Sequence, residues 1–391
     1  MKNTEQNKPA RETRLEKALT PKRSRLEEFW VLFKKNRLAI AGLIIFILFF
    51  AAALAGLFLT SGQNPVFDPA QIRLQEKLRP PMAKANLDSL LPAEVPRLGI
   101  YFFGTDDLGR DVFARMLQGS WVSLTVGFVA VGISVFIGIF MGGIAGYFGQ
   151  ILLKMDHILI SGLMVAGIAF MTSGWALTGF LFFILTAVFL LYTVRIKKIA
   201  KNRARRAGTG FFEINAFSVD TLIMRIVDIM ICFPSFFLIL TVVALLPASI
   251  YNIMIVIGLT SWMGATRFVR AEFLSLREQD FVAAARALGV GNLRIIFRHM
   301  MPNAIAPVLV SATIGIASAI LTEAGLSFLG FGVPPPHATW GNIISDGKRF
   351  IFDAPWLTFI PGISILVVVL SFNLFGEGLR DALNPKLRER H

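Results

Sequence analysis

The chain has 391 residues, of which 55% are hydrophobic and only 16% are charged. Soluble globular domains carry roughly 25% charged residues, and so few charges could not cover the apolar surface of a soluble protein of this length. The composition therefore predicts an all-α polytopic membrane protein. The net charge of +14 is typical either of a nucleic-acid-binding protein or of basic cytoplasmic loops. The single cysteine, Cys232, excludes an intrachain disulfide and a cysteine-built metal site.

Two charge-free runs near the N-terminus each predict one membrane-spanning helix. The first covers residues 38–60 and follows a basic tail at 1–37, and it is too long for a signal peptide. The second lies within residues 122–149 and carries Gly138, Gly142 and Gly146. Such a stripe of small residues lets another helix approach closely, so ordinary helix packing is the simplest role for it.

Two later runs are too long for one helix each. Residues 158–194 form a charge-free run of 37 residues, which would measure about 55 Å as a helix against a bilayer core of about 30 Å. A fold at Thr172 to Gly174 would give two helices of about 27 Å. Residues 229–265 have the same character and are broken at Pro247 to Ser249. Each run therefore predicts a helical hairpin.

Single spans at residues 300–322 and 356–375 bring the expected number of spanning helices to eight. The charges support this number. Basic segments lie at 1–37 (11 Lys and Arg, 5 acids), 195–206 (7 basic, no acid) and 267–298 (6 Arg, 3 acids), whereas 61–115 and 330–355 are balanced. With eight helices every basic segment faces the side of the N-terminal tail, as the positive-inside bias requires. Both termini are therefore expected in the cytoplasm. Nucleic acid is not an expected partner, since no basic stretch is interleaved with stacking aromatic residues.

Motifs for catalysis are missing from the sequence. The nearest approach to a phosphate loop, at residues 341–348, has one residue too many between its glycines, and Arg349 stands where a Ser or Thr is required. The four histidines are not spaced as metal ligands, and no nucleophile elbow occurs. We therefore expect a protein that is not an enzyme and has no cofactor or metal; any ATP would be hydrolysed on another chain.

Few charged residues lie close to the predicted spans. Arg225 and Asp228 are three residues apart and can pair on one helix face. Glu323 lies near the outer end of the seventh predicted helix. It is a candidate gate or partner contact, and the simpler reading is an interfacial charge that reaches headgroups or a partner loop.

The segment 267–301 is the most informative loop. Residues 283–288 are rich in strong helix formers, Gly289 suits a left-handed C-cap, and Asn292 can cap a following helix. Pro302 stands where the chain returns to the membrane. This pattern predicts two short helices with a break. A small, smooth helix suits a partner's groove, although an amphipathic helix on the membrane surface would look similar.

The loop resembles the cytoplasmic motif of permease subunits of binding-protein-dependent ABC importers, in which Glu-Ala-Ala, three residues, Gly, nine residues and Ile-x-Leu-Pro follow one another. The matching positions are Ala284, Ala285, Gly289 and Pro302, whereas Ala283, His299 and Met301 replace the Glu, Ile and Leu. The resemblance implies that these four residues belong to an ATPase-coupling loop.

Further motifs resemble the dipeptide, oligopeptide and nickel permeases of that family. They are FKKNRLA at 33–39, FGTDDLGRDV at 103–112, SFLG at 327–330, WGN at 340–342, FNL at 372–374, GLRD at 378–381 and Asn384-Pro385. The resemblance covers about residues 33–149 and 218–385. It implies a six-helix type I ABC importer permease core, into which residues 150–217 insert a helical hairpin. The insertion is either a peripheral addition or a docking site for anionic lipid or a regulator through its basic cluster.

The expected organisation is then a cytoplasmic tail (1–37), a first helix (38–60), an external segment (61–121), a second helix (122–149), the insertion (150–217), the core (218–385, with the loop 267–301) and a cytoplasmic tail (386–391). The resemblance implies a homologous second permease, two cytoplasmic ATPases and an external solute-binding protein as partners in a bacterial or archaeal cytoplasmic membrane. The chain would form half of the pathway for peptides, with nickel, opines or glycans still open. An ATP-independent secondary transporter or channel is the alternative, and a membrane scaffold is a third possibility.

Overall fold

The computed structural model describes residues 25–383 except 63, 89, 93, 150–151, 155–162, 165–166, 169–170, 172–179, 189 and 192–214. The described chain is mainly helical and divides into two compact units. Unit 1 is drawn from residues 1–131, 240–257 and 309–391, and unit 2 from residues 132–239 and 258–308. Four helices contribute to both units: α4 (Val112–Phe148), α8 (Ser235–Leu245), α9 (Ile250–Thr260) and α13 (Met301–Phe328).

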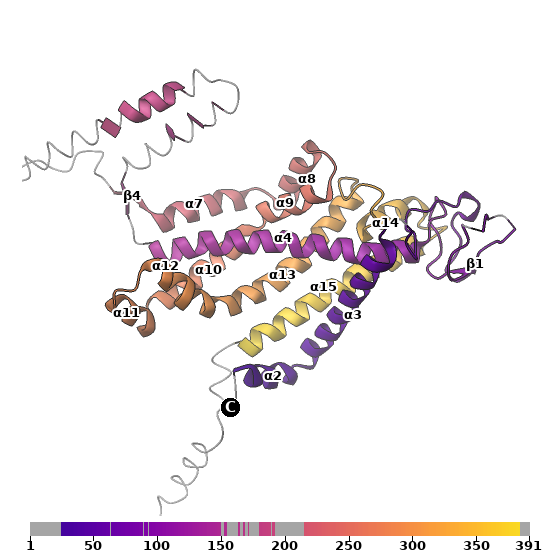
Figure 1. Cartoon of the computed structure of the whole chain (residues 1–391), viewed down its shortest axis with the longest axis horizontal. Coiled ribbons are helices and arrows are strands. Elements are labelled where there is room, and N and C mark those ends of the chain that lie inside the picture. Colours follow the sequence, from indigo (N-terminus) through magenta and orange to yellow (C-terminus); the bar gives the residue numbers. More distant parts are fainter. Residues whose placement is uncertain are drawn as a thin grey trace, which may run out of the picture. The chain divides into compact units, whose positions relative to one another are not determined.

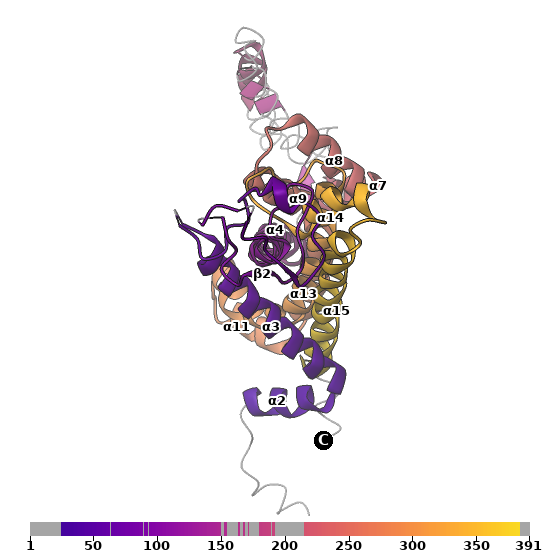
Figure 2. The same ribbon diagram turned by 90° about the vertical axis from the view of Figure 1, so that its right-hand side faces the viewer.

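In unit 1, helix α3 (Arg37–Thr60) lies beside α15 (Trp356–Leu383), and α2 (Arg25–Lys35) turns away from α3 at its start (Figures 1 and 2). Glycine allows the two long helices to approach closely, because a Cβ atom at Gly42 would lie 2.9 Å from the Leu374 Cβ. Asn36 accepts a hydrogen bond from the Ala39 amide at 3.1 Å and so caps α3. The corner between α2 and α3 is therefore fixed by a helix cap.

A cluster of phenylalanine rings fills the space between these helices. Phe46 of α3 stacks on Phe375 of α15 with the ring centroids 5.9 Å apart, and it meets Phe372 edge-on at 5.2 Å. Phe128 of α4 packs on Phe372 at 6.0 Å. Offset and edge-on aromatic pairs of this kind are favourable beyond the area that they bury, so they join three helices of unit 1.

The segment between α3 and α4 contains a short helix, η1 (Leu74–Glu76), and the antiparallel strands β1 (Ala83–Lys84) and β2 (Ile100–Tyr101). It leads into α4 at Val112, ten residues before the predicted start of the second span at residue 122. The apolar run starts late because Arg115 and Gln118 interrupt it. Both side chains are hydrogen-bonded inside unit 1, so the helix tolerates them: the Gln118 Oε1 accepts from the Ala338 amide at 2.6 Å.

Unit 2 contains the end of α4, the antiparallel strands β3 (Leu152–Lys154) and β4 (Asn215–Ser218), helix α7 (Val219–Cys232) and helix α10 (Trp262–Arg277). Three short helices follow: α11 (Asp280–Ala287), α12 (Asn292–Arg294) and the π-helix η3 (Ile295–Met300). They gather beside the end of α4 (Figure 1). A buried cluster that includes Phe273, Val282 and Ile295 holds them together.

Four described helices are long and apolar enough to cross a membrane: α3, α4, α12 with α13, and α15. Two bent pairs, α7 with α8 and α9 with α10, would raise the number to six. The predicted break at Pro247 is confirmed, since α8 ends at Leu245 and α9 begins at Ile250. A second break, an 81° bend at Pro234, was not predicted. Proline lacks an amide hydrogen and holds the preceding Phe233 extended, at φ −83° and ψ 131°.

Several predictions lie outside the described residues. They include the fold at Thr172 to Gly174 in the hairpin of 158–194, the basic cluster at 195–206, the motif Asn384-Pro385, most of the N-terminal tail and the whole C-terminal tail. The number of eight spans therefore stays a prediction.

Candidate functional sites

The first candidate site is the loop of the motif at 103–112, which folds around one buried carboxylate. The Oδ1 atom of Asp106 accepts hydrogen bonds from the amides of Leu108 and Arg110, both at 2.9 Å. Gly104 and Gly109 have positive φ angles of 78° and 73°. A Cβ atom at Gly104 would lie 2.6 Å from the Arg79 carbonyl oxygen. The two glycines are required because the loop is both left-handed and tightly packed at these points.

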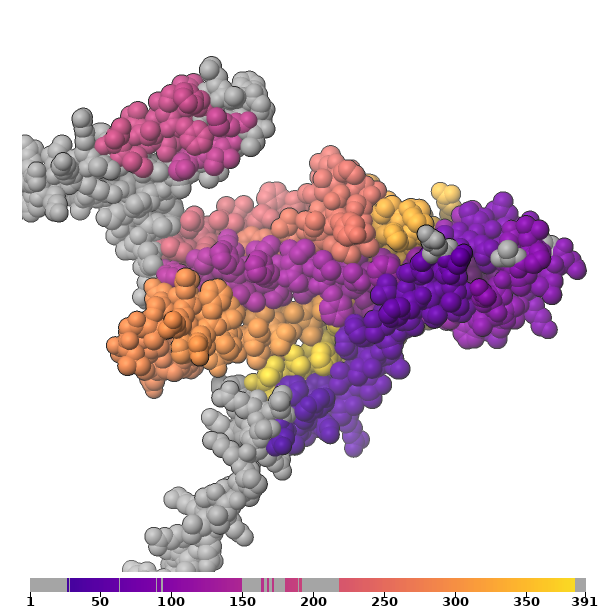
Figure 3. Space-filling model, in the orientation of Figure 1, coloured from indigo at the N-terminus to yellow at the C-terminus, as the bar shows by residue number. Residues whose placement is uncertain are grey.

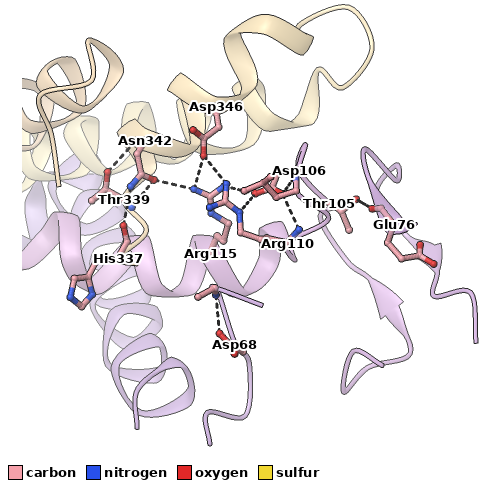
Figure 4. A network of polar contacts seen from close by, with 12 residues as sticks. Asp68, Glu76, Thr105, Asp106, Arg110, Arg115, His337, Thr339, Asn342 and Asp346 are labelled. Atoms are coloured by element: carbon pink, nitrogen blue, oxygen red, sulfur yellow. Dashed lines mark hydrogen bonds and ion pairs between the residues drawn. The ribbon is translucent and has the colours of Figure 1, made fainter. Parts of the chain in front are cut away.

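Two arginines connect this loop to α14 (Trp340–Gly347), as Figure 4 shows. Asp106 Oδ2 accepts from Arg110 Nε at 2.6 Å and from an Arg115 guanidinium nitrogen at 2.5 Å. The same two arginines also donate to Asp346 Oδ2, at 3.0 and 2.9 Å. Asp106 is fully buried and Arg115 is 4% exposed, so solvent screens the ion pair between them little, whereas Asp346 is 36% exposed. Hydrogen bonds between charged groups are stronger than neutral ones, and this shared arrangement also fixes the position of the loop against α14.

The start of α14 completes the network. Thr339 and Asn342 form a reciprocal capping box, and the Asn342 side chain also donates to the His337 carbonyl oxygen at 3.0 Å. A cavity of about 560 Å³ opens beside it, lined by the two arginines, by Asp107 and Asp346, and by prolines 334–336. Burial, together with nearby Asp106 and Asp346, raises the pKa of Asp107. The cavity therefore combines charges of both signs with an apolar wall.

Asp111 sits just before α4 and accepts a hydrogen bond from the Phe113 amide at 2.9 Å. The bond satisfies one of the free amides at the helix start. The residue is 6% exposed. Burial raises its pKa to about 6, although the hydrogen bonds from Phe113 and Ala114 and the charge of Arg73 oppose this shift. Its negative charge at neutral pH is thus held at a cost in desolvation.

Glu323 does not lie at an interface, contrary to the simpler prediction. It is fully buried in α13, and it accepts hydrogen bonds from Ser327 Oγ at 2.7 Å and from Ser123 Oγ at 3.2 Å. Thr339 donates to Ser327 Oγ at 3.4 Å. The carboxyl group is thus enclosed by hydroxyl groups from α4, α13 and the start of α14 and cannot reach lipid headgroups.

The second candidate site is the loop after α10. Helix α11 ends at Ala287, and Gly289 has a φ angle of 73°, so the predicted left-handed cap is confirmed. The Gly289 amide donates to the Arg286 carbonyl and the Val290 amide to the Ala285 carbonyl, which is a Schellman motif. The predicted capping role of Asn292 is wrong: Asn292 is the first residue of α12, and its side chain accepts instead from Tyr147 Oη at 2.8 Å.

The chain returns to α13 through the π-helix η3, which was not predicted. Pro302, in the first turn of α13, has no amide hydrogen, and its ring would clash with the Arg298 carbonyl in an α-helix. The Met301 amide instead donates to the Ile296 carbonyl, five residues back.

The four residues of the predicted coupling loop occupy different environments. Ala285 is buried among Phe273, Ile295 and their neighbours, whereas Ala284 is exposed, as is Ala283. Three large apolar side chains of the loop are exposed: Leu288 (83%), Leu293 (69%) and Phe297 (60%). The loop, drawn in orange, lies at the surface in the space-filling view (Figure 3). The loop thus has a buried side and three exposed large apolar side chains.

The structure places the three glycines of α4 against α10. A Cβ atom at Gly142 would lie 2.6 Å from the Thr266 carbonyl oxygen, and one at Gly146 would lie 2.5 Å from the Phe273 Cβ. A Cβ atom at Gly138 would overlap the side chain of Ala265. The backbones of α4 and α10 therefore approach closely where the loop begins.

Ion pairs strengthen the same unit. Arg225 and Asp228 pair only loosely, at 4.0 Å, and Asp228 pairs more closely with Arg267, at 2.6 Å. Arg270 of α10 forms an ion pair with Asp220 of α7 through its Nε and one terminal guanidinium nitrogen. Charges along α7 are thus tied to α10.

Sequence reasoning missed the residues that make the long-range contacts. Asp106, Arg115 and Asp346 lie within or near recognised motifs, but nothing in the pattern pairs residues more than 200 positions apart. Tyr147 belongs to the segment GYFG at 146–149, and Arg286 and Asn292 to the loop, without any spacing that connects them. The recognised motifs pointed to these segments, but no sequence pattern identified which residues contact one another.

Comparison with known proteins agrees with this architecture. The profile of the family described as "binding-protein-dependent transport system inner membrane component" matches residues 214–389, and that of the "N-terminal TM domain of oligopeptide transport permease C" matches residues 24–81. Neither profile includes residues 82–213. The sequence is 36% identical to a dipeptide transport system permease protein of Alkalihalophilus pseudofirmus, over 91% of this chain and 88% of that protein.

Two other relatives give the same result. A dipeptide transport system permease protein of Haemophilus influenzae is 31% identical over 93% of this chain and 96% of its own length. An oligopeptide transport system permease protein of Bacillus subtilis is 30% identical over 91% of this chain and 88% of its own length. The fold and these relatives define a multi-pass membrane subunit of a transport system, not an enzyme. The chain belongs to the family of permease components of binding-protein-dependent ABC transport systems, together with the dipeptide and oligopeptide permeases.

Proposed function

We propose that this chain forms half of the translocation pathway of an ATP-driven importer for peptides, and that the loop 267–301 is its contact with an ATPase. The names of the relatives support peptides as the substrate class. The described residues supply no phosphate loop, so ATP hydrolysis would take place on separate subunits. A homologous second permease, two ATPases and an external solute-binding protein would complete the complex.

One observation carries the proposal: the loop exposes three large apolar side chains, Leu288, Leu293 and Phe297. Large apolar side chains that are exposed mark a surface for another protein or for membrane. Helices that dock in a groove lay apolar side chains into it. The loop is supported from its buried side, where Val282 and Ala285 of α11 pack against η3.

The basic residues of the loop support a cytoplasmic location. The segment 267–298 carries six arginines and three acids, whereas 61–115 is balanced. The positive-inside bias therefore favours the loop and both termini on the cytoplasmic side and the motif at 103–112 on the outer side. In this arrangement the outer cavity would face the external solute-binding protein. Movement of α11 with the ATPases would then shift the helices that continue from the loop.

The test is co-purification of the ATPase subunits with substituted permease. Replacing Leu288 and Leu293 by glutamate places two charges on the proposed contact, where an unpaired buried charge costs several kcal/mol. We expect at least a tenfold loss of bound ATPase, with insertion of the permease and binding of its partner permease retained. Leu87, 67% exposed in the segment 61–115, is the matched control, and Leu87→Glu should leave ATPase binding unchanged.

ATPases that bind the doubly substituted loop as well as the wild-type loop would show that the contact lies elsewhere. Transport by the wild-type complex that depends on an ion gradient and persists in vanadate would instead indicate a secondary transporter.

A further inference from the structure

Tyr147 joins the two halves of the loop after α10. It is the penultimate residue of α4, it is 7% exposed, and its ring packs edge-on against Phe148 with the centroids 4.8 Å apart. The Arg286 guanidinium lies over the Tyr147 ring, 5.2 Å from its centroid. The phenolic Oη donates a hydrogen bond to Asn292 Oδ1 at 2.8 Å. One side chain thus makes two different polar contacts with the loop.

The two contacts lie on opposite sides of the break in the loop. Arg286 stands in the last turn of α11, and Asn292 is the first residue of α12. Between them, Gly289 is left-handed, and a Cβ atom at Gly289 or Gly291 would meet no atom within 4 Å. The glycines themselves leave the angle between α11 and α12 to the surrounding contacts. These contacts are the buried cluster that contains Val282 and Ile295, and the side chain of Tyr147.

Tyr147 also stands where the loop meets the closest helix packing of the unit. Gly142 and Gly146, within the preceding turns of α4, bring the helix backbone against α10. Contacts at such short range leave little room for α4 to slide past α10. Because Tyr147 belongs to α4, a displacement of α11 that reaches Tyr147 would be passed to α4 as a whole. A loop that rotated freely at its glycines would instead absorb the displacement.

We propose that Tyr147 is a positioning residue for energy coupling: it makes α11 and α12 move as one body with the end of α4. The proposal rests on the proposed function, in which α11 contacts an ATPase. The face of the phenol ring contacts the Arg286 guanidinium, and the phenol hydroxyl donates a hydrogen bond to Asn292. The contacts of Tyr147 with Arg286 and Asn292 do not involve Leu288, Leu293 or Phe297. Loss of these contacts therefore leaves the three exposed apolar side chains available to an ATPase.

The hydroxyl can be removed without the ring. Tyr147→Phe keeps the contact with Arg286 and deletes only the donor to Asn292, and Asn292→Ala deletes the acceptor on an exposed residue. In the assembled transporter, reconstituted in proteoliposomes with its ATPases and binding protein, the measured quantity is ATP hydrolysed per solute transported. We expect each variant to raise this ratio about two- to fivefold, the order of one lost hydrogen bond, while the ATPases still co-purify.

A rescue variant and a double variant distinguish a specific loss of coupling from a general loss of structure. Asn292→Asp keeps an acceptor for the tyrosine and should return the ratio to near the wild-type value. The double variant Tyr147→Phe with Asn292→Ala should be no worse than either single variant, because both remove the same bond. The control is Tyr251→Phe, which removes a hydroxyl from a tyrosine that is 71% exposed in α9 and should not change the ratio.

A wild-type ratio in both Tyr147→Phe and Asn292→Ala, with ATPases bound, would overturn the role of Tyr147 and leave the proposed function intact. Failure of the wild-type chain to bind ATPases at all would instead overturn the proposed function. If Tyr147→Phe does not assemble, Asn292→Ala and Asn292→Asp decide the question alone, and equal ratios in these two variants would contradict the proposal.

Discussion

Asp111 is the residue at which burial and charge conflict most clearly. Its carboxylate caps α4 but lies almost out of contact with solvent, and its pKa is raised from 3.8 to about 6 by burial. The folded state therefore binds the proton more tightly than the unfolded state does. By linkage, stability falls as the pH rises from about 4 to about 6, and the full cost of the charge is present above that range.

Asp111→Asn should remove this cost while it keeps the cap, because asparagine and aspartate cap helices about equally well. We expect the variant to match the wild-type protein near pH 4 and to exceed it by roughly 1–3 kcal/mol above pH 6, from the size of the pKa shift. Thermal unfolding of the detergent-purified protein across this pH range measures the difference. Asp88→Asn, at an exposed position, is the control; a constant offset at all pH values would contradict the assignment to Asp111.

At the scale of the element, α4 contains two kinds of glycine. Gly142 faces the Thr266 carbonyl and Val269 of α10 at distances that leave no room for a methyl group, whereas nothing lies within 4 Å of the position that a Cβ atom would take at Gly132. Both residues lie in the same helix, so the intrinsic gain on replacing glycine by alanine, roughly 0.5–1 kcal/mol, is shared. The two glycines therefore differ only in that Gly142 contacts α10 and Gly132 does not.

Gly142→Ala should therefore destabilise the protein by about 1–3 kcal/mol, the usual cost of overpacking, and Gly132→Ala should stabilise it slightly. The thermal midpoints of the two purified variants, each compared with the wild type, give the answer. Equal effects of the two substitutions would mean that α4 and α10 are not in close contact in the membrane.

The same elements show how far the sequence could be read. The period of the glycines, the left-handed residue at Gly289 and the break at Pro247 follow from local rules, and each is visible within a few positions. The bend at Pro234 follows from an equally local rule, but it lies within the apolar run 229–265, which was divided only at Pro247 to Ser249. The early start of α4 and the burial of Glu323 depend on partners such as Asp346 and Ser123, which no local pattern identifies.

At the scale of the whole molecule, the strands β3 and β4 bring the two ends of the segment 155–214 together. Lys154 lies opposite Asn215 in the antiparallel ladder, so the segment leaves and returns at one point. The two matched family profiles also leave out residues 82–213. A segment attached in this way can be exchanged for a short turn without moving either strand.

We therefore predict that replacing residues 155–214 by Asn-Gly leaves a permease that inserts, reaches the wild-type amount in the membrane and binds the ATPases. A wild-type yield and ATPase binding in the shortened chain would identify the insertion as a peripheral addition. Loss of a dependence on anionic lipid in the shortened chain, measured as transport in vesicles with and without phosphatidylglycerol, would assign the lipid-docking role to the basic cluster at 195–206. Failure of the shortened chain to insert would contradict the prediction.

The ion network of Asp106, Arg115 and Asp346 also sets an order of events during biosynthesis. Arg115 leaves the ribosome 231 residues before Asp346, which completes its pairing. At typical elongation rates this interval is on the order of ten to fifty seconds. Throughout that time Asp106 is the one carboxylate of the network that the nascent chain can offer to both Arg110 and Arg115. The end of the permease that contains this network can therefore reach its final arrangement only when α14 has been synthesised, so completion of the network reports that nearly the whole chain has been made.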